Sequence, residues 1–169
     1  EIYLVNKTTG ESREYSNGMN IRGTGGWKIK AIVTDKDSIG KLQIKQKLDD
    51  NTEVTKNLIE TDATTQDFKK NTNASWKFNA WKDSATATQN VADKEKPKYV
   101  EFECDLDQIN TADNFVGTLT LSVIAADASD HEGVESGTVS IDTMNPVVAA
   151  ENEAGYGICK SVMDTNGFY

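Results

Sequence analysis

The side chains that could carry acid–base or nucleophilic chemistry are few, and their spacing matches no familiar catalytic arrangement. The chain of 169 residues has a single histidine, His131, and two cysteines. A Ser-His-Asp triad would need His131 as its base, but no Gly-x-Ser-x-Gly elbow accompanies it. Carboxylates are abundant, yet no pair stands out as the acid and base of a glycosidase. We therefore predict that the protein is not an enzyme, with a hydrolase that uses an unrecognised carboxylate pair as the open alternative.

Acidic residues close together in one turn raise the question of a calcium site. Asp127, Asp130 and Glu132 cluster there, and calcium is bound by about six to eight oxygens from such loops. Their spacing does not follow the calcium loop of helix–loop–helix proteins. Short acidic side chains at turns are also explained by hydrogen bonds to the local backbone. These three residues are thus possible calcium ligands, and we predict no other cofactor.

The two cysteines, Cys104 and Cys159, form an even pair that permits one disulfide in a secreted protein. Cys104 alternates with charged residues and is expected to point inward. A bridge to Cys159 would anchor the C-terminal part of the chain and reduce the entropy of the unfolded state. The alternative is two separate thiols, in which Cys104 serves as a small buried apolar residue. Neither arrangement resembles a zinc site, because no Cys/His cluster is present.

Two tryptophans, Trp76 and Trp81, are five residues apart. In a regular strand this spacing places them on opposite faces. One of them could then be exposed, where it would stack on a sugar or pack in a subunit interface. The alternative is that a bulge or bend buries both.

The elements that would position these residues are strands. Apolar and polar residues alternate with a period of two in several segments, which is typical of half-buried strands. Turn-forming clusters separate them, and 84–98 is a polar stretch that we interpret as a long loop. A short helix is conceivable only at 59–68 or 110–115. The predicted fold is an all-β antiparallel sandwich, immunoglobulin-like or jelly-roll-like. The alternating segments are 27–34, 41–48, 76–80, 100–106, 118–125 and 138–142.

The composition narrows the classes of partner. Lys and Arg number 18 against 27 Asp and Glu, a net charge of −9. Nucleic acids and anionic membranes attract clustered positive charge, so we predict neither as a partner. No apolar run approaches the roughly 20 residues of a membrane span. With 37% hydrophobic residues, the chain can still bury a core.

Two stretches resemble bacterial immunoglobulin-like modules. Residues 117–142 followed by Thr143-Met144-Asn145-Pro146-Val147-Val148 are similar to the last two strands and exit of such a module, with Asp127-Ala128 and Pro146 at matching positions. Residues 28–48 resemble its strand–turn–strand hairpin, with Asp35 and Ser38-Ile39-Gly40 matching. These modules have about 100 residues. The resemblance therefore implies a sandwich over 1–145 with an enlarged middle section, 51–98, and a C-terminal extension or assembly segment, 146–169.

A weaker similarity connects 113–126, Asp-Asn-Phe-Val-Gly-Thr-Leu-Thr-Leu-Ser-Val-Ile-Ala-Ala, to secreted matrix-fibre subunits of the TasA and camelysin type. Both resemblances imply an extracellular, cell-surface or virion protein with a structural or adhesive role. The chain also begins with Glu1 rather than Met, which we interpret as a processed mature protein or a fragment.

The expected mechanism is assembly through the edges of the sandwich, either with further copies in a filament or with other surface or virion proteins. The candidates for a strand that pairs with a neighbour are the N-terminal residues and the extension 146–169. The alternative for the N-terminal residues is that they form the first strand of their own sandwich. The competing function is a carbohydrate-binding or adhesion module of a larger secreted protein. The N-terminal candidate residues are Ile2, Tyr3, Leu4 and Val5.

Overall fold

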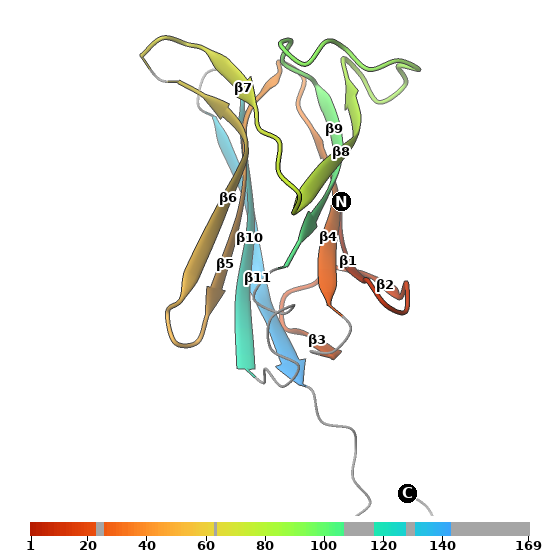
Figure 1. Cartoon of the computed structure of the whole chain (residues 1–169), viewed down its shortest axis with the longest axis vertical. Helices are drawn as coiled ribbons and strands as arrows, with labels where there is room; N and C mark the ends of the chain where they lie inside the picture. Colours follow the sequence, from red (N-terminus) through yellow and green to blue (C-terminus); the bar gives the residue numbers. More distant parts are fainter. Residues whose placement is uncertain (23–25, 63, 107–116, 128–130, 143–169) are drawn as a thin grey trace, which may run out of the picture.

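The computed structural model describes residues 1–22, 26–62, 64–106, 117–127 and 131–142. In these residues all regular structure is β, and the strands form two sheets that face each other (Figure 1). The predicted all-β sandwich is thereby confirmed. The first sheet has the order β2 (Ser12–Glu14), β1 (Ile2–Asn6), β4 (Trp27–Thr34), β9 (Tyr99–Asp105), β8 (Trp76–Lys82). The second has the order β3 (Met19–Arg22), β11 (Glu132–Asp142), β10 (Gly117–Asp127), β5 (Ile39–Leu48), β6 (Glu53–Thr61), β7 (Phe68–Lys70).

The strand order is that of a variable-type immunoglobulin sandwich. Strands β1, β4, β9 and β8 take the places of strands A, B, E and D in one sheet. Strands β11, β10, β5, β6 and β7 take the places of G, F, C, C′ and C″ in the other. The chain changes sheet after β2, so that β3 runs parallel to β11. The middle section, 51–98, contains β6, β7 and β8.

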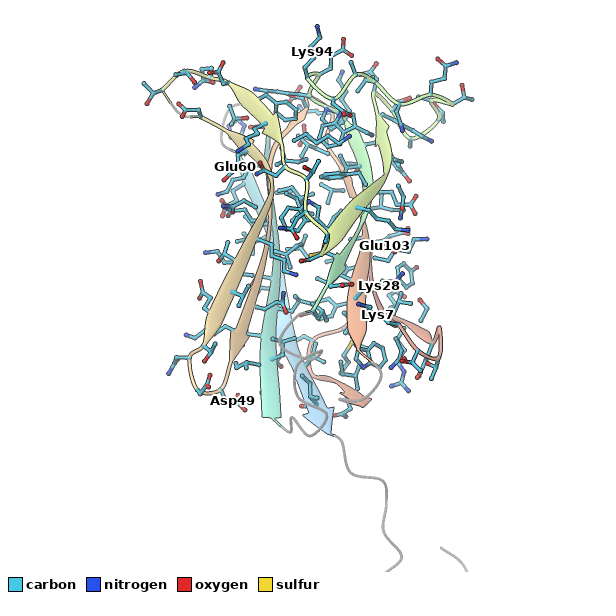
Figure 2. All side chains as sticks on the ribbon, viewed as in Figure 1. Lys7, Lys28, Asp49, Glu60, Lys94 and Glu103 are labelled. Carbon is cyan, nitrogen blue, oxygen red and sulfur yellow. The ribbon has the colours of Figure 1, made fainter. Side chains whose placement is uncertain are left out.

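The period-two alternation becomes the two faces of each sheet. In β4, Trp27, Ile29 and Ala31 are buried, while the lysines between them are on the outer face. Lys28 on this face pairs with Glu103 of β9 at 2.6 Å (Figure 2), a cross-strand pair of the kind that stabilises sheets modestly. Each large apolar side chain that is fully buried contributes about 1.5–3 kcal/mol. The fully buried core also includes Leu4, Leu42, Ile44, Leu58, Ile59, Trp81, Val100, Phe102, Leu106, Leu119 and Val139.

A β-bulge in β8 decides where its tryptophans point. The register with β9 shifts between Phe78 and Ala80, so Asn79 is an extra residue in β8. As a result Trp76, Phe78 and Trp81 all pack against the core, and Trp81 is only 1% exposed. Regular alternation, which would place the two tryptophans on opposite faces, is interrupted at Asn79. The alternative, a bulge that turns both toward the core, describes the structure, with Trp76 half-buried.

The prediction of a possible short helix at 59–68 is wrong. Its first residues end β6 and Phe68 begins β7, and the two strands pair with each other. A register shift of β6 against β5 leaves Leu58 opposite no residue, so that Leu58 and Ile59 are both buried. Two adjacent apolar residues interrupt the alternation of a strand and can suggest a helix, but here they lie at a β-bulge. The other possible helix, 110–115, lies outside the described residues.

The segment 84–98 contains no strand, as predicted, and lies at the upper end of the sandwich in Figure 1. The indole Nε1 of Trp81 donates a hydrogen bond to the carbonyl of Glu95 at 3.1 Å. The backbone N–H of Ile39 donates to the carbonyl of Pro97 at 2.7 Å. The loop is therefore tied to both sheets.

Candidate functional site: an open edge of the sandwich

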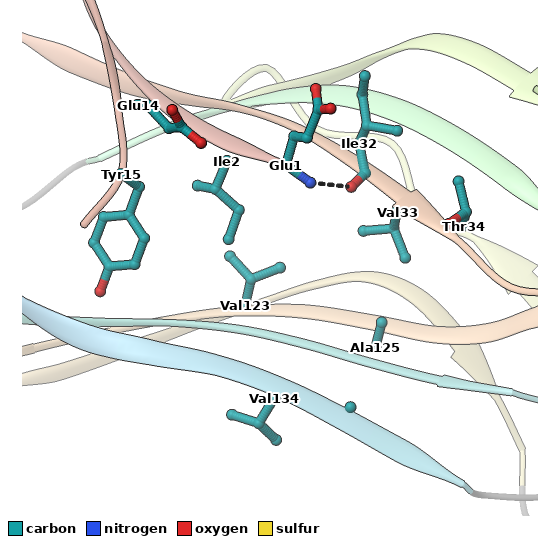
Figure 3. A pocket seen from close by; sticks show the side chains of 11 residues that line it. Glu1, Ile2, Glu14, Tyr15, Ile32, Val33, Thr34, Val123, Ala125 and Val134 are labelled. Atoms are coloured by element: carbon teal, nitrogen blue, oxygen red, sulfur yellow. Dashed lines mark hydrogen bonds between the residues drawn. The ribbon is translucent and has the colours of Figure 1, made fainter. Parts of the chain in front are cut away.

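A cleft of about 490 Å³ opens between the two sheets beside the first residue of β1. Ile2 and Val33 point into it from the first sheet, and Val123 and Ala125 face them from β10 (Figure 3). Tyr15 closes one end. The remaining lining residues are Glu1, Glu14, Ile32, Thr34, Gly133 and Val134.

The cleft exists because strands at this side of the sandwich end at different heights. Strand β1 begins opposite Ala31, so the last residues of β4 continue beyond it. In the second sheet β3 pairs with β11 only from Val139 to Asp142, so the first part of β11 continues beyond β3. Each sheet therefore has an outer edge that is covered along part of its length only.

The hydrogen-bonding direction of the β11 edge follows from Thr138. Its N–H donates to Oδ1 of Asn17 at 2.9 Å and its carbonyl accepts from the N–H of Gly18 at 2.7 Å, so both groups point away from β10. In an antiparallel pair this direction repeats at every second residue. The N–H and C=O groups of Ser136 and Val134 therefore point outward from the sheet as well. Among the residues that the structure describes, no strand pairs with this part of the edge.

At the facing edge of the first sheet, the end of β4 also directs backbone groups outward, over fewer residues. The N–H of Ile32 donates to the carbonyl of Glu1 at 2.9 Å, and the N-terminal ammonium donates to the carbonyl of Ile32 at 3.2 Å. Thr34 has the same direction as Ile32, two residues further along β4. The cleft thus lies between two sheet edges that both present backbone groups.

The side chains of β11 leave the cleft open. Gly133 faces it, and a Cβ atom built there would meet only the carbonyl of Ala125, at 3.9 Å. Val134, on the same stretch, is 53% exposed and is the one large apolar residue so exposed in the described part of the chain. An apolar cleft beside an exposed valine on an unpaired strand edge is an arrangement that accepts an additional strand.

The N-terminal candidate for a donated strand lies within its own sandwich. Ile2, Tyr3, Leu4 and Val5 belong to β1, which pairs with β4 on one side and with β2 on the other. Leu4 is fully buried. The structure therefore does not show these residues as a donated strand, and their donation to a neighbour stays a prediction. The alternative, a first strand of the same sandwich, describes the structure, because pairing on both sides satisfies the backbone of β1 within the chain.

The acidic turn residues have local partners. The carboxylate of Asp127 accepts hydrogen bonds from the backbone N–H of His131 at 2.9 Å and contacts its Nδ1 at 2.8 Å. This hydrogen bond and the charge of Asp127 raise the pKa of His131. Glu132 pairs with Lys41 at 2.8 Å, and Asp130 lies outside the described residues. In the described part no three His, Cys, Asp or Glu side chains gather as metal ligands. These contacts favour the interpretation in which the acids support the turn.

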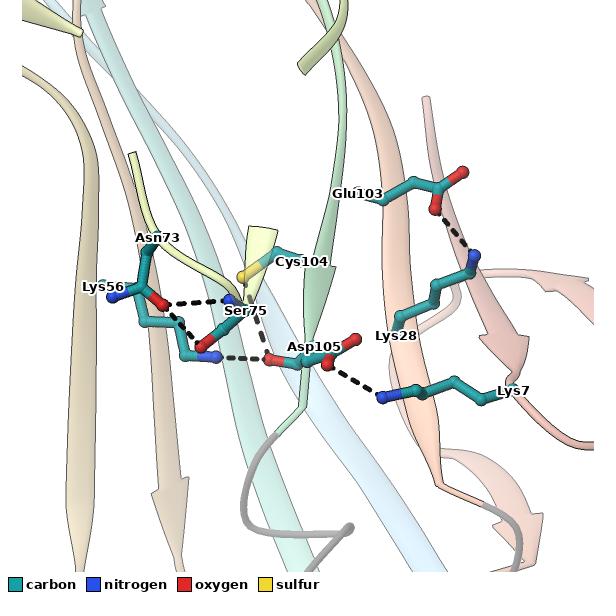
Figure 4. A network of polar contacts seen from close by, with 8 residues as sticks. All are labelled: Lys7, Lys28, Lys56, Asn73, Ser75, Glu103, Cys104 and Asp105. Atoms are coloured by element: carbon teal, nitrogen blue, oxygen red, sulfur yellow. Dashed lines mark hydrogen bonds and ion pairs between the residues drawn. The ribbon is translucent and has the colours of Figure 1, made fainter. Parts of the chain in front are cut away.

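Cys104 is buried in β9 beside a group of polar contacts (Figure 4). Its Sγ lies 3.8 Å from the carbonyl of Asp105, and that carbonyl also accepts a 2.7 Å hydrogen bond from Nζ of Lys56. Cys159 lies outside the described residues, so the Cys104–Cys159 disulfide stays a prediction. Labelling of free thiols in the denatured, non-reduced protein tests it, and two reactive thiols would contradict it.

Glu103 lies on the outer face near this group. Partial burial raises the pKa of its carboxyl, but the hydrogen bond and charge of Lys28, with further help from Asn79 and Lys77, outweigh that effect and lower the pKa overall. The arrangement is an outer-face ion pair, and it does not resemble a catalytic acid.

A second, more polar cleft of about 480 Å³ lies where β6 and β7 approach β8. Trp76 is half-buried in its wall and donates its indole N–H to the carbonyl of Asn71 at 3.1 Å. Asn71 in turn donates to Glu60 at 2.7 Å. Trp76 thus lies beside a cleft, whereas Trp81 is enclosed by the core.

The residues of the β11 edge were missed by sequence reasoning. Alternation marks only 138–142 of this strand, and Gly133, Val134 and Ser136 fall between that segment and the acidic turn. One signal was available: the run Gly133-Val134-Glu135-Ser136-Gly137 has a single charged residue and neither lysine nor proline, the residues that commonly protect an edge strand. Compared with known protein families and with curated proteins, the chain matches none. The described residues also contain no helix of the length and hydropathy that crossing a membrane requires.

Proposed function

We propose that the protein is a non-enzymatic structural or adhesive subunit of a surface filament or a virion, which assembles through strand pairing at the β11 edge. The observation that carries this proposal is the stretch of β11 at Val134 and Ser136, with which no described strand pairs, beside an apolar cleft. Strand edges of this kind favour pairing with another chain, because backbone hydrogen bonds and apolar burial act together.

The acidic charge of the protein is consistent with a subunit that assembles outside the cell. The net charge of −9 keeps separate copies soluble until specific edges meet. It also supports the proposal that neither nucleic acid nor an anionic membrane is the partner. The resemblance to bacterial immunoglobulin-like modules and to matrix-fibre subunits points to the same location.

The lining of the cleft supports a binding role over catalysis. Its titratable side chains, Glu1, Glu14 and Tyr15, belong to the first residue and to the stretch after β1. The centre is formed by Ile2, Val33, Val123 and Ala125. Such a cleft offers burial to an apolar segment, and its described lining includes no histidine or cysteine.

Replacing Val134 by lysine tests the proposal. Val134 is exposed, so Val134→Lys should leave the sandwich folded while it places a charge at the edge, as natural edge strands do. We expect the full chain to form oligomers whose mass grows with concentration in sedimentation velocity. Val134→Lys should reduce this association strongly, and the control Val134→Thr should retain it. A chain that stays monomeric at high concentration would contradict the proposal.

The second candidate function is carbohydrate binding at the cleft of Trp76. The observation that favours it is a partly exposed indole beside Asn57, Glu60 and Asn71, because saccharides are bound by aromatic faces together with amide and carboxylate groups. Titration with a panel of oligosaccharides, followed by tryptophan fluorescence, tests it. A saturable signal in the full chain that Trp76→Phe abolishes would support this function, and no signal with any sugar would contradict it.

A further inference from the structure

We propose that the strand which completes the β11 edge is the segment 143–169 of a second copy, with Pro146-Val147-Val148-Ala149-Ala150 as its pairing part. This inference rests on the proposed function and names the partner of the same site. The inference requires that the donor segment suits the cleft, that it can reach the cleft, and that a second copy is better placed to supply it than the same chain.

The sequence 146–150 suits both sides of the position that it would occupy. A strand on the β11 edge turns one face to the cleft and the other to the outer face, where Val134 is 53% exposed. Val147 and Ala149 alternate with Val148 and Ala150, so both faces of the donor are apolar. The small side chains fit the part of the cleft where Ala125 of β10 lies opposite Gly133 of β11. Proline is tolerated as the first residue of a strand.

Charge also selects this stretch. Every copy carries a net charge of −9, and Glu1 and Glu14 line the cleft. A charged donor would either repel these groups or lose its hydration on burial. Residues 146–150 contain no charged side chain, so they can be buried without either penalty.

The position at which the segment begins favours a neighbour as its source. Strand β11 has 11 residues and runs from the cleft at Glu132 to Asp142 at the lower end of the sandwich in Figure 1. At a rise of ~3.3 Å per residue the two ends are about 30 Å apart. Residue 143 therefore begins at the end opposite to the cleft. Copies stacked end to end bring this end of one sandwich to the cleft of the next.

The same geometry gives the direction of pairing. A donor that enters at the open end of the cleft and runs toward β3 is parallel to β11, as β3 already is. Its place ends where Tyr15 and Asn17 approach Gly137. Each copy then donates at one end and accepts at the other, and such head-to-tail contacts extend into a filament unless they close into a ring.

The experiment uses full-length variants in two groups. Donor variants carry Val147→Asp with Ala149→Asp, and their control is Ile158→Asp, in the other apolar stretch of the same segment. Acceptor variants are Gly133→Ile, which fills the cleft, and Ser136→Pro, which removes an outward N–H. The control for the latter is Ser136→Ala. Circular dichroism establishes that each variant is folded, and sedimentation velocity gives the molar mass.

We expect the unchanged chain and both controls to form concentration-dependent oligomers, and the donor and acceptor variants to be monomeric on their own. An equimolar mixture of a donor variant with an acceptor variant should form a one-to-one dimer and nothing larger, because one intact donor meets one intact edge. Use of two acceptor variants keeps the test decisive if one of them fails to fold.

The other outcomes separate the inference from the proposed function. If the acceptor variants are monomeric but the donor variant still forms oligomers, another segment fills the edge; this inference fails and the proposed function stands. If Ile158→Asp, and not the donor variant, prevents association, the pairing stretch is misassigned. If the acceptor variants assemble normally, the proposed function itself fails. A monomeric full chain whose Val134 and Ser136 amides are protected from exchange would show that the segment binds its own sandwich, which overturns the role of a second copy.

Discussion

The hydroxyl group of Tyr15 occupies the space beside Gly137, only 2.5 Å from where a Cβ atom of that residue would be. Tyr15 follows β2 and Gly137 belongs to β11, so this contact joins the two sheets at the closed end of the cleft. It also sets the limit of the open edge, because from Thr138 onward β11 is covered by Asn17, Gly18 and β3.

Replacing Gly137 by alanine should destabilise the sandwich. The new Cβ would overlap Tyr15 and would also lie 2.9 Å from Oδ1 of Asn17, the atom that accepts the N–H of Thr138. Moving both side chains should lower the free energy of unfolding by about 1–3 kcal/mol, the usual cost of overpacking. Urea denaturation measures this change. Gly133→Ala is the matched control, since its Cβ meets no close atom, and an equal loss in both variants would contradict the account.

The contact between His131 and Asp127 should make stability depend on pH. The hydrogen bond and charge of Asp127 raise the pKa of His131 in the folded state. A raised histidine pKa stabilises the fold fully below the unfolded value of about 6.5, and this contribution is lost as pH rises through the folded pKa. The other charged groups near the ring are Asp35 and Asp37, with the Lys41–Glu132 pair adjacent in the chain.

His131→Gln isolates this effect. The melting temperature of the original protein should exceed that of the variant at pH 5.5, and the difference should shrink at pH 9. The backbone N–H of residue 131, which also donates to Asp127, is kept in the variant. A difference that is constant with pH, or that grows toward pH 9, would show that the pair does not titrate as described.

The two tryptophans of β8 should differ sharply in their contribution to stability. Trp81 is 1% exposed, and its indole donates to the Glu95 carbonyl, whereas Trp76 is half-buried at the second cleft. Trp81→Ala should cost about 3–5 kcal/mol, as expected for a buried aromatic side chain. Trp76→Ala should cost distinctly less. Chemical denaturation followed by circular dichroism measures both, and equal costs would argue against the bulge at Asn79.

Much of the fold was predictable from alternation alone. Segment 27–34 is strand β4 with the expected inward residues, and 100–106 differs from β9 by one residue at each end. Such strands are half-buried, so every second residue is apolar and the sequence pattern predicts which side chains are buried. The strands β2, β3 and β7 have three or four residues, too few for alternation to be recognised. The first half of β11 was hidden for another reason: Gly133 and Gly137 lie in it, and glycines directly after an acidic stretch are typical of a turn.

The candidate site was less predictable than the fold. An open edge is defined by where β1 and β3 end relative to β4 and β11, and these are distances between segments far apart in the chain. The apolar residues of the cleft, such as Val33 and Val123, are present in the alternating segments, but alternation does not distinguish them from ordinary core residues. Residues 1–5 illustrate the same limit, since an apolar strand has the same sequence pattern whether it pairs within its own chain, as β1 does, or with a neighbour.

Amide hydrogen exchange, followed by NMR at increasing protein concentration, tests the central claim most directly. In the separate subunit the N–H groups of Val134 and Ser136 point outward and should exchange rapidly, whereas those of Gly133 and Gly137 point toward β10. As the protein associates, we predict strong additional protection of Val134 and Ser136, with little change at Gly133 and Gly137. Association that leaves Val134 and Ser136 as exposed as before, or no association at any concentration, would contradict assembly through the β11 edge.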